Sequence, residues 1–199
     1  MKLNFYIILL LLLSFVVKAD QMLELIKIPN LTLHKLENKN SLAYLKPTKD
    51  FFVGSSFKNV SCKKNQSQNF NEKYLEAQKG FNKYNDDFFR KIKLKYIVLC
   101  SELEIAGIPA LGFANPEMKT LIFNINTNNS NFERVLHHEV FHIIEHNFNK
   151  YFLNISWSDL NSKEFKYSAC STCSNNYSLE KIYNSKGFVS EYAKSTISE

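Results

Sequence analysis

The chain has 199 residues, of which 45% are hydrophobic and 22% are charged, and its formal net charge is +6. This length and composition are typical of one globular domain with enough apolar material for a core. Its basic residues are scattered, and neither a lysine and arginine cluster nor a basic and aromatic stripe is present. The sequence therefore argues against a nucleic-acid-binding protein.

The amino terminus has the pattern of a signal peptide. Lys2 precedes an apolar run from Phe5 to Val17, and Ala19 is a small residue suited to cleavage. The run is short for a membrane span. We therefore predict a signal peptide over residues 1–19 and a protein exported to the periplasm or the extracellular space, with no stable membrane span after cleavage. An uncleaved amino-terminal anchor is the alternative.

Cleavage would remove two lysines and no acidic residue, which lowers the net charge to +4. The cysteines are Cys62, Cys100, Cys170 and Cys173. In an exported chain an even number favours disulfides, for which three pairings are possible. The Cys170-Ser-Thr-Cys173 segment could instead be a redox pair or half a zinc site, but neither the β-α-β setting nor further ligands are evident. We predict structural disulfides and leave their pairing open.

Residues 20–64 form an irregular lead-in, in which short apolar pieces are broken by prolines, Gly54 and lysines, and we expect one or two strands there. From Gln66 to Lys91 aromatic residues recur at helical spacing, with an interruption near Gly80. We expect these aromatics to pack in the core. They are Phe70, Tyr74, Phe81, Tyr84 and Phe88.

Two β-rich runs, residues 95–100 and 120–125, predict strands. The polar residues 126–129 then lead to Ser130-x-x-Glu133, a capping box that predicts a helix from about residue 131 to about residue 147. The apolar residues of this helix available for burial are Phe132, Leu136, Phe141 and Ile144.

The predicted helix contains His138-Glu139-Val140-Phe141-His142, a match to H-E-x-x-H. Residues i and i+4 share one face of a helix, so both histidines can bind one zinc ion. Glu139 follows His138 by about 100° of rotation, within reach of a zinc-bound water. It can take the proton of that water as the water attacks a carbonyl. A solvated helix face that matches by chance is the alternative.

A catalytic zinc needs a third protein ligand and an open position for water. His137 points about 100° away from His138, and His146 lies about 12 Å along the helix from it, so both suit the surface or the surroundings of the site better than the metal. No histidine follows His146, so a carboxylate is implied. The candidates are Asp159, Glu164, Glu180, Glu191 and Glu199.

Three segments together resemble a family of bacterial putative zinc-binding metallopeptidases of the zincin class. They are the H-E-x-x-H motif, Trp157-x-x-Leu-Asn-x-x-x-Phe-x-Tyr167, and Gly187-Phe-Val-Ser-Glu-Tyr-Ala193. The resemblance covers about residues 66–199. The more distant lethal-factor-like gluzincins are similar in the order of their site residues, because a tyrosine precedes the zinc-binding glutamate at the spacing of Tyr192 and Glu199.

This resemblance implies an α+β fold of zincin architecture, in which a small twisted sheet packs on the H-E-x-x-H helix and further helices. It implies one zinc ion bound by His138, His142 and Glu199, with Glu139 as the base and Tyr192 as a donor to the oxyanion. Two simpler roles stay open. Thr196-Ile-Ser-Glu199 also fits a capping box, and Tyr192 could be an ordinary half-buried aromatic.

Gly112-Phe113-Ala114 is a candidate edge strand beside the site, and zincin substrates often pair with such an edge. The implied function is an exported zinc-dependent endopeptidase that acts on peptide or protein substrates, with its domain over residues 65–199. The family pattern continues beyond Glu199, so we expect a truncated copy or a degenerate relative. The rival is a non-catalytic exported protein with a vestigial or structural zinc site. Zinc hydrolysis of a non-peptide amide shares the same chemistry.

Overall fold

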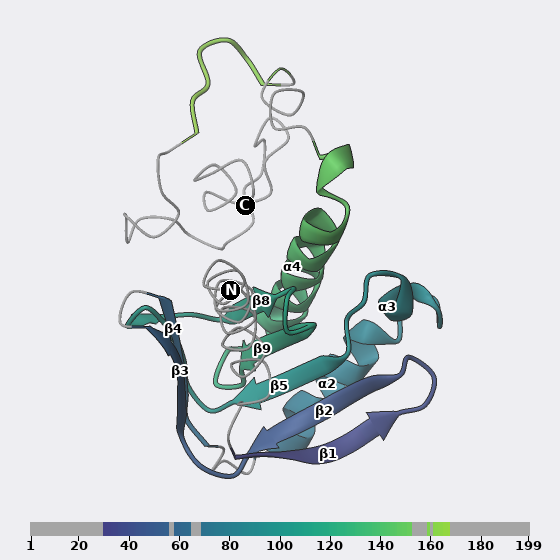
Figure 1. Ribbon diagram of the computed structural model, residues 1–199, viewed down its shortest axis with the longest axis vertical. Coiled ribbons are helices and arrows are strands. Elements are labelled where there is room, and N and C mark those ends of the chain that lie inside the picture. The colour runs from purple at the N-terminus through teal and green to yellow at the C-terminus, as the bar shows by residue number, and fades with distance from the viewer. Residues whose placement is uncertain (1–29, 56–57, 65–68, 153–158, 160, 168–199) are drawn as a thin grey trace, which may run out of the picture.

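The computed structural model of the protein describes residues 30–55, 58–64, 69–152, 159 and 161–167. Runs of strands are separated by helices along the chain, which makes a mixed α+β fold, as predicted (Figure 1). In order they are β1 (Leu31–Glu37), β2 (Leu42–Pro47), β3 (Phe51–Ser55), β4 (Lys58–Cys62), α2 (Phe70–Phe81), α3 (Phe88–Lys91), β5 (Tyr96–Cys100), β6 (Leu103–Ile105), β7 (Ile108–Pro109), β8 (Gly112–Asn115), β9 (Thr120–Asn124), α4 (Asn129–Asn147) and the 3-10 helix η1 (Asn149–Tyr151). Of the helices in these ranges, none is both long and apolar enough to cross a membrane.

The strands form two sheets. The larger one has five strands in the order β1-β2-β5-β9-β8, and the smaller one has four in the order β3-β4-β6-β7. Strands β2, β5 and β9 run parallel to one another, whereas β1 and β8 are antiparallel to their neighbours and form the two edges. The chain leaves β5, adds β6 and β7 to the smaller sheet, and returns to the larger sheet through β8.

The central strands of the larger sheet are covered on both faces. Successive side chains of a strand point to opposite faces. In β5, Ile97 and Leu99 belong to the core shared with α2 and α4, whereas Val98 and Cys100 belong to the core shared with the smaller sheet. The β5 strand is therefore apolar throughout, as its sequence predicted, and the helices and the smaller sheet lie on opposite sides of it (Figure 1).

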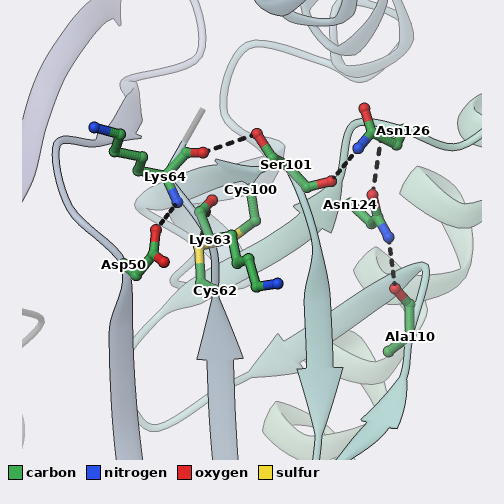
Figure 2. Close-up of a disulfide and its surroundings, with 9 residues drawn as sticks. All are labelled: Asp50, Cys62, Lys63, Lys64, Cys100, Ser101, Ala110, Asn124 and Asn126. Carbon is green, nitrogen blue, oxygen red and sulfur yellow. Dashed lines mark hydrogen bonds between the residues drawn. A yellow bond between two sulfur atoms is a disulfide. The ribbon is translucent and has the colours of Figure 1, made fainter. Parts of the chain in front are cut away.

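A disulfide joins the two sheets. Cys62 at the end of β4 is bonded to Cys100 at the end of β5, and both residues are fully buried (Figure 2). Beside it, the Asn126 side chain donates to the Ser101 carbonyl at 2.6 Å, and the Ser101 hydroxyl donates to the Lys64 carbonyl at 3.0 Å. The prediction of a structural disulfide is confirmed for this pair, whereas Cys170 and Cys173 lie outside the described residues.

The part of the lead-in that the structure describes holds four strands, where the sequence predicted one or two. The β1 strand was not predicted because its side chains are mostly exposed and its alternation of apolar and polar residues is broken by a register shift between Leu33 and Lys35. Strands β3 and β4 are short, and β3 contains Gly54, which has a positive φ of 106°. The lead-in is thus an integral part of both sheets.

The predicted helix over residues 66–91 is interrupted, as expected, and consists of α2 and α3. Phe70, Tyr74 and Phe81 are buried, and Tyr84 and Phe88 pack against the same core, which confirms the expected role of these aromatics. Helix α2 packs on α4, where the Lys73 ammonium lies 4.6 Å from the centre of the Phe132 ring.

Helix α4 begins two residues earlier than predicted, and its cap is different. The Asn128 side chain accepts a hydrogen bond from the Asn131 backbone N–H at 3.2 Å, which makes Asn128 the N-cap. The capping box at Ser130 and Glu133 was therefore a wrong prediction. Both patterns offer a polar residue before the apolar stripe, and the sequence alone does not choose between them.

The buried face of α4 is also partly different from the prediction. Phe132 and Leu136 are fully buried as expected, but the Phe141 side chain is 39% exposed. Burial instead follows residues spaced three and four apart, the stripe that faces a sheet. The residues of this stripe are Phe132, Val135, Leu136, Glu139, Val140 and Ile143. Glu139 is the one carboxylate in it, and α4 therefore buries a charged side chain on its apolar face.

Candidate metal centre

Helix α4 brings His138 and His142 together. They stand one helical turn apart, and their Nε2 atoms lie 3.0 Å from each other. The two rings meet edge to face, with centroids 4.6 Å apart. Both side chains are half-buried, so the nitrogens face each other at a site that solvent still reaches.

This arrangement fits two ligands of one zinc ion. Two imidazole nitrogens bound to a tetrahedral zinc at about 2.0–2.1 Å would lie about 3.3 Å apart. The observed 3.0 Å is close to that separation. Two nitrogen lone pairs repel each other at such a distance unless a proton or a cation lies between them. The donor set is therefore suited to a cation.

The described residues supply no third ligand, since they contain no group of three or more His, Cys, Asp or Glu side chains placed to hold a metal. Among the carboxylate candidates, Asp159 and Glu164 are within the described part of the chain, are exposed and do not complete such a group. Glu199 and Tyr192 lie outside the described residues. The same is true of the expected signal peptide, residues 1–19.

Glu139 is buried against the edge strand β8. Its side chain is only 6% exposed. A Cβ atom built on Gly112 would lie 2.7 Å from both Cγ and Oε1 of Glu139, which is much closer than van der Waals contact. The backbone of β8 therefore rests directly on the carboxylate that the motif offers as a base.

Glu145 is a further candidate site residue, which the sequence did not predict. Its Oε2 lies 3.4 Å from Nδ1 of His142, the ring nitrogen opposite to the one that faces His138. A carboxylate in this place orients a histidine ring and directs its other nitrogen toward a metal. The signal was available, because a residue three positions after His142 lies on the same side of the helix.

His137 occupies a different environment from His138. Its Nδ1 lies 2.7 Å from the Tyr84 hydroxyl, and its Nε2 lies 3.5 Å from Oε1 of Glu133. Burial raises the pKa of Tyr84. Lys83 donates a hydrogen bond to Glu133, which together with His137 lowers the pKa of that carboxyl. His137 thus ties α4 to the end of α2, and His146 is exposed.

The predicted edge strand at Gly112 is confirmed, since β8 is the last strand of the larger sheet. Gly112 stands opposite Phe123 of β9, and the Leu111 carbonyl accepts from the Asn124 N–H at 2.9 Å. In an antiparallel pair, residues with and without backbone hydrogen bonds to the partner strand alternate. The backbone of Phe113 therefore forms hydrogen bonds with β9, whereas the backbones of Gly112 and Ala114 do not. The peptide N–H and C=O groups of Gly112 and Ala114 therefore point to the open edge.

Residues 69–199 match the model of one protein family, and the matched region includes α2, β5 to β9 and the whole of α4. No curated protein and no solved structure matches the chain. The family's description is that of a zinc-binding enzyme that cleaves peptides, which agrees with the paired nitrogens of His138 and His142. By this match the chain belongs to the family described as putative zinc-binding metallo-peptidase.

Proposed function

We propose that the protein is an exported zinc-dependent endopeptidase whose active site is built on α4. The observation that carries this proposal is the pair of imidazole nitrogens 3.0 Å apart, with the buried Glu139 carboxylate beside them against an edge strand. The family supports zinc binding and peptide-bond cleavage. The positions of His138, His142 and Glu139 on α4 support the same chemistry.

His138 and His142 would hold one zinc ion, with Glu199 as the third ligand. Glu145 would fix the ring of His142 through Nδ1. When bound, zinc would supply Lewis acidity, which polarises a substrate carbonyl and lowers the pKa of a water molecule. The remaining chemistry belongs to the side chains of the protein.

Glu139 would act as the general base. A carboxylate oxygen of Glu139 would accept a proton from the water that attacks the peptide carbonyl, and would then pass this proton to the departing amine. Its burial under β8 holds the side chain in one place, which favours proton transfer over a fixed distance. The Tyr192 hydroxyl would donate a hydrogen bond to the carbonyl oxygen as negative charge develops there.

The substrate would bind as an extended strand along β8. The outward N–H and C=O groups of Gly112 and Ala114 are the main-chain partners that such a strand requires. Pairing through the main chain does not need a free end of the substrate. An edge that accepts the middle of a chain therefore favours cleavage at internal bonds over removal of terminal residues.

Export is supported by two independent features. Residues 1–19 have the pattern of a signal peptide. The Cys62–Cys100 disulfide is the kind of cross-link that persists in oxidising surroundings outside the cytoplasm.

The proposal is tested with Glu139→Gln, which keeps the shape of the side chain and removes its basicity. We expect one zinc ion per chain in both forms, and kcat for a peptide library to fall by about 10²–10⁴-fold in the variant. Hydrolysis by the native protein should cease with a chelator and return with zinc. His146→Gln, at an exposed histidine of the same helix, is the matched control and should change neither quantity.

Two results would overturn the proposal. One is hydrolysis by Glu139→Gln at the native rate, which removes the base from the mechanism. The other is a zinc-loaded native chain that cleaves no member of the library, which favours a binding protein.

A further inference from the structure

We infer that Gly112 is a positioning residue for Glu139, because the missing side chain of this glycine sets where the carboxylate lies. The inference deepens the proposed function and rests on it in one respect, the role of Glu139 as the base. The contact itself is a feature of the fold and can be tested without any activity.

Gly112 is a glycine because of a close approach and not because of its backbone conformation. The glycines with positive φ in the described residues are Gly54 and Gly107, and Gly112 is not among them. Its place in a regular antiparallel pair with β9 would suit any residue. What excludes a side chain is the neighbour, since an added Cβ would lie 2.7 Å from Glu139 and 2.8 Å from Cγ1 of Val135.

The side chains of Val135 and Glu139 have little room to move away from a Cβ at Gly112. Val135 and Glu139 are one turn apart on α4, so a Cβ at Gly112 would press on the same face of the helix at two points. One of the two Glu139 atoms concerned is Cγ, which stands near the root of the side chain and moves only with a change of rotamer. The carboxylate would then leave its present position while the helix and the two histidines remain.

Gly80 of α2 provides a matched control, because it also packs against α4. A Cβ at Gly80 would lie 2.9 Å from Cδ1 of Leu136, the far end of a flexible side chain in the same buried stripe of α4. Gly80→Ala and Gly112→Ala thus make the same chemical change against the same helix. Only the second one touches Glu139.

The experiment is a double-mutant cycle of Gly112→Ala with Glu139→Ala, read out in two ways. In kinetics with zinc-loaded protein, we expect Gly112→Ala to lower kcat by about 10²-fold, the scale for a displacement of about 1 Å, with zinc content unchanged. In the Glu139→Ala background the same substitution should leave the residual kcat at saturating substrate unchanged, because its effect on kcat acts through Glu139.

The second readout is Tm, which does not depend on catalysis. Gly112→Ala should lower Tm by several degrees in the native background and by clearly less in the Glu139→Ala background, where the contact is gone. Gly80→Ala should shift Tm equally in both backgrounds and leave kcat unchanged. If Gly112→Ala does not fold, Gly112→Ala with Val135→Ala removes one of the two contacts and serves in its place.

Equal Tm shifts for Gly112→Ala in both backgrounds would overturn the inference, as would a folded, zinc-loaded Gly112→Ala protein with native kcat. A native protein without activity would instead contradict the proposed function. In that case the Tm cycle still decides whether Gly112 and Glu139 are coupled.

Discussion

The two sides of α4 differ in what their histidines contact, although His137 and His138 are adjacent in the sequence. His138 faces an imidazole nitrogen of His142, and a carboxylate oxygen of Glu145 lies 3.4 Å from the other ring nitrogen of His142. The ring nitrogens of His137 face Glu133 of the same helix and Tyr84 of the segment that follows α2. One residue of helical rotation, about 100°, separates the proposed metal site from the contacts of His137.

This difference shows that the partners of a histidine determine its role. The first side, with His138 and His142, is half-buried and brings two imidazole nitrogens within 3.0 Å of each other. On the second side, His137 contacts a tyrosine hydroxyl and a carboxylate. We expect substitutions on the first side to change zinc binding and activity, and substitutions on the second side to change stability alone.

The largest contrast is expected between His138→Ala and His137→Ala. The first removes one of two nitrogens that lie 3.0 Å apart, so bound zinc after dialysis and peptide hydrolysis should both fall to background. The second should retain full zinc content and the native rate. Metal analysis of the two dialysed proteins measures this contrast. Loss of zinc in His137→Ala would contradict the difference between the two sides of α4.

A smaller effect is expected at Glu145, for which we propose a role in orienting His142 and not in binding the metal. Glu145→Gln should weaken zinc affinity by about 10–100-fold, measured by competition with a chelator, and leave the fold intact. Glu133→Gln is the control on the other side of the helix, where the same chemical change should leave zinc affinity as it is. Equal zinc affinities in the two variants would show that Glu145 does not support zinc binding.

Tyr84→Phe tests the structural side directly. The variant removes a hydroxyl that lies 2.7 Å from Nδ1 of His137 and leaves the ring in its stack on Phe88. We expect a loss of about 1 kcal/mol in the free energy of unfolding, measured in denaturant, with zinc content unchanged. Zinc loss without a loss of stability would contradict the separation of the two sides.

The smallest effect concerns the ion pair of Glu133 and Lys83. Because the folded pKa of Glu133 is lowered from its ordinary 4.5, its contribution to stability is present above that value and is lost as the pH falls through the lower folded pKa. The pair is exposed, so this contribution should be only a few tenths of a kcal/mol. The free energies of unfolding of the native protein and of Glu133→Gln should converge as the pH falls from 7 to 3. At pH 7, 1 M salt should remove the difference between them.

The sequence predicted those parts of the fold whose burial is periodic. The 3.6-residue pattern gave α2 and α4, and the continuous apolar runs gave β5 and β9, because each of these elements buries a whole stripe or both faces. The edge strand β1 is mostly exposed, so it has neither a buried stripe nor a continuous apolar run. The cap of α4 was missed because Asn128 and Ser130 are both good caps, and the choice depends on where β9 ends.

The sequence predicted those candidate site residues that lie together on one helix. His138, Glu139 and His142 follow from their spacing, and Glu145 follows the same geometry although it was not recognised. The contact of Gly112 with Glu139 could not be predicted, because it joins two elements 27 residues apart and depends on the distance between a strand and a helix. The assignment of Tyr192 and Glu199 stays a prediction.

The Cys62–Cys100 bond closes the chain between them into a covalent ring, with a sequence separation of 38, and this ring contains α2, the helix on which α4 rests. A loop of that length restricts the unfolded chain enough to contribute about 4 kcal/mol of stability in the chain-entropy model. A whole domain has a stability of only about 5–15 kcal/mol. A thiol reductant would therefore weaken the support of the histidine pair without touching a ligand, and zinc retention by this protein should decline as the ring is opened.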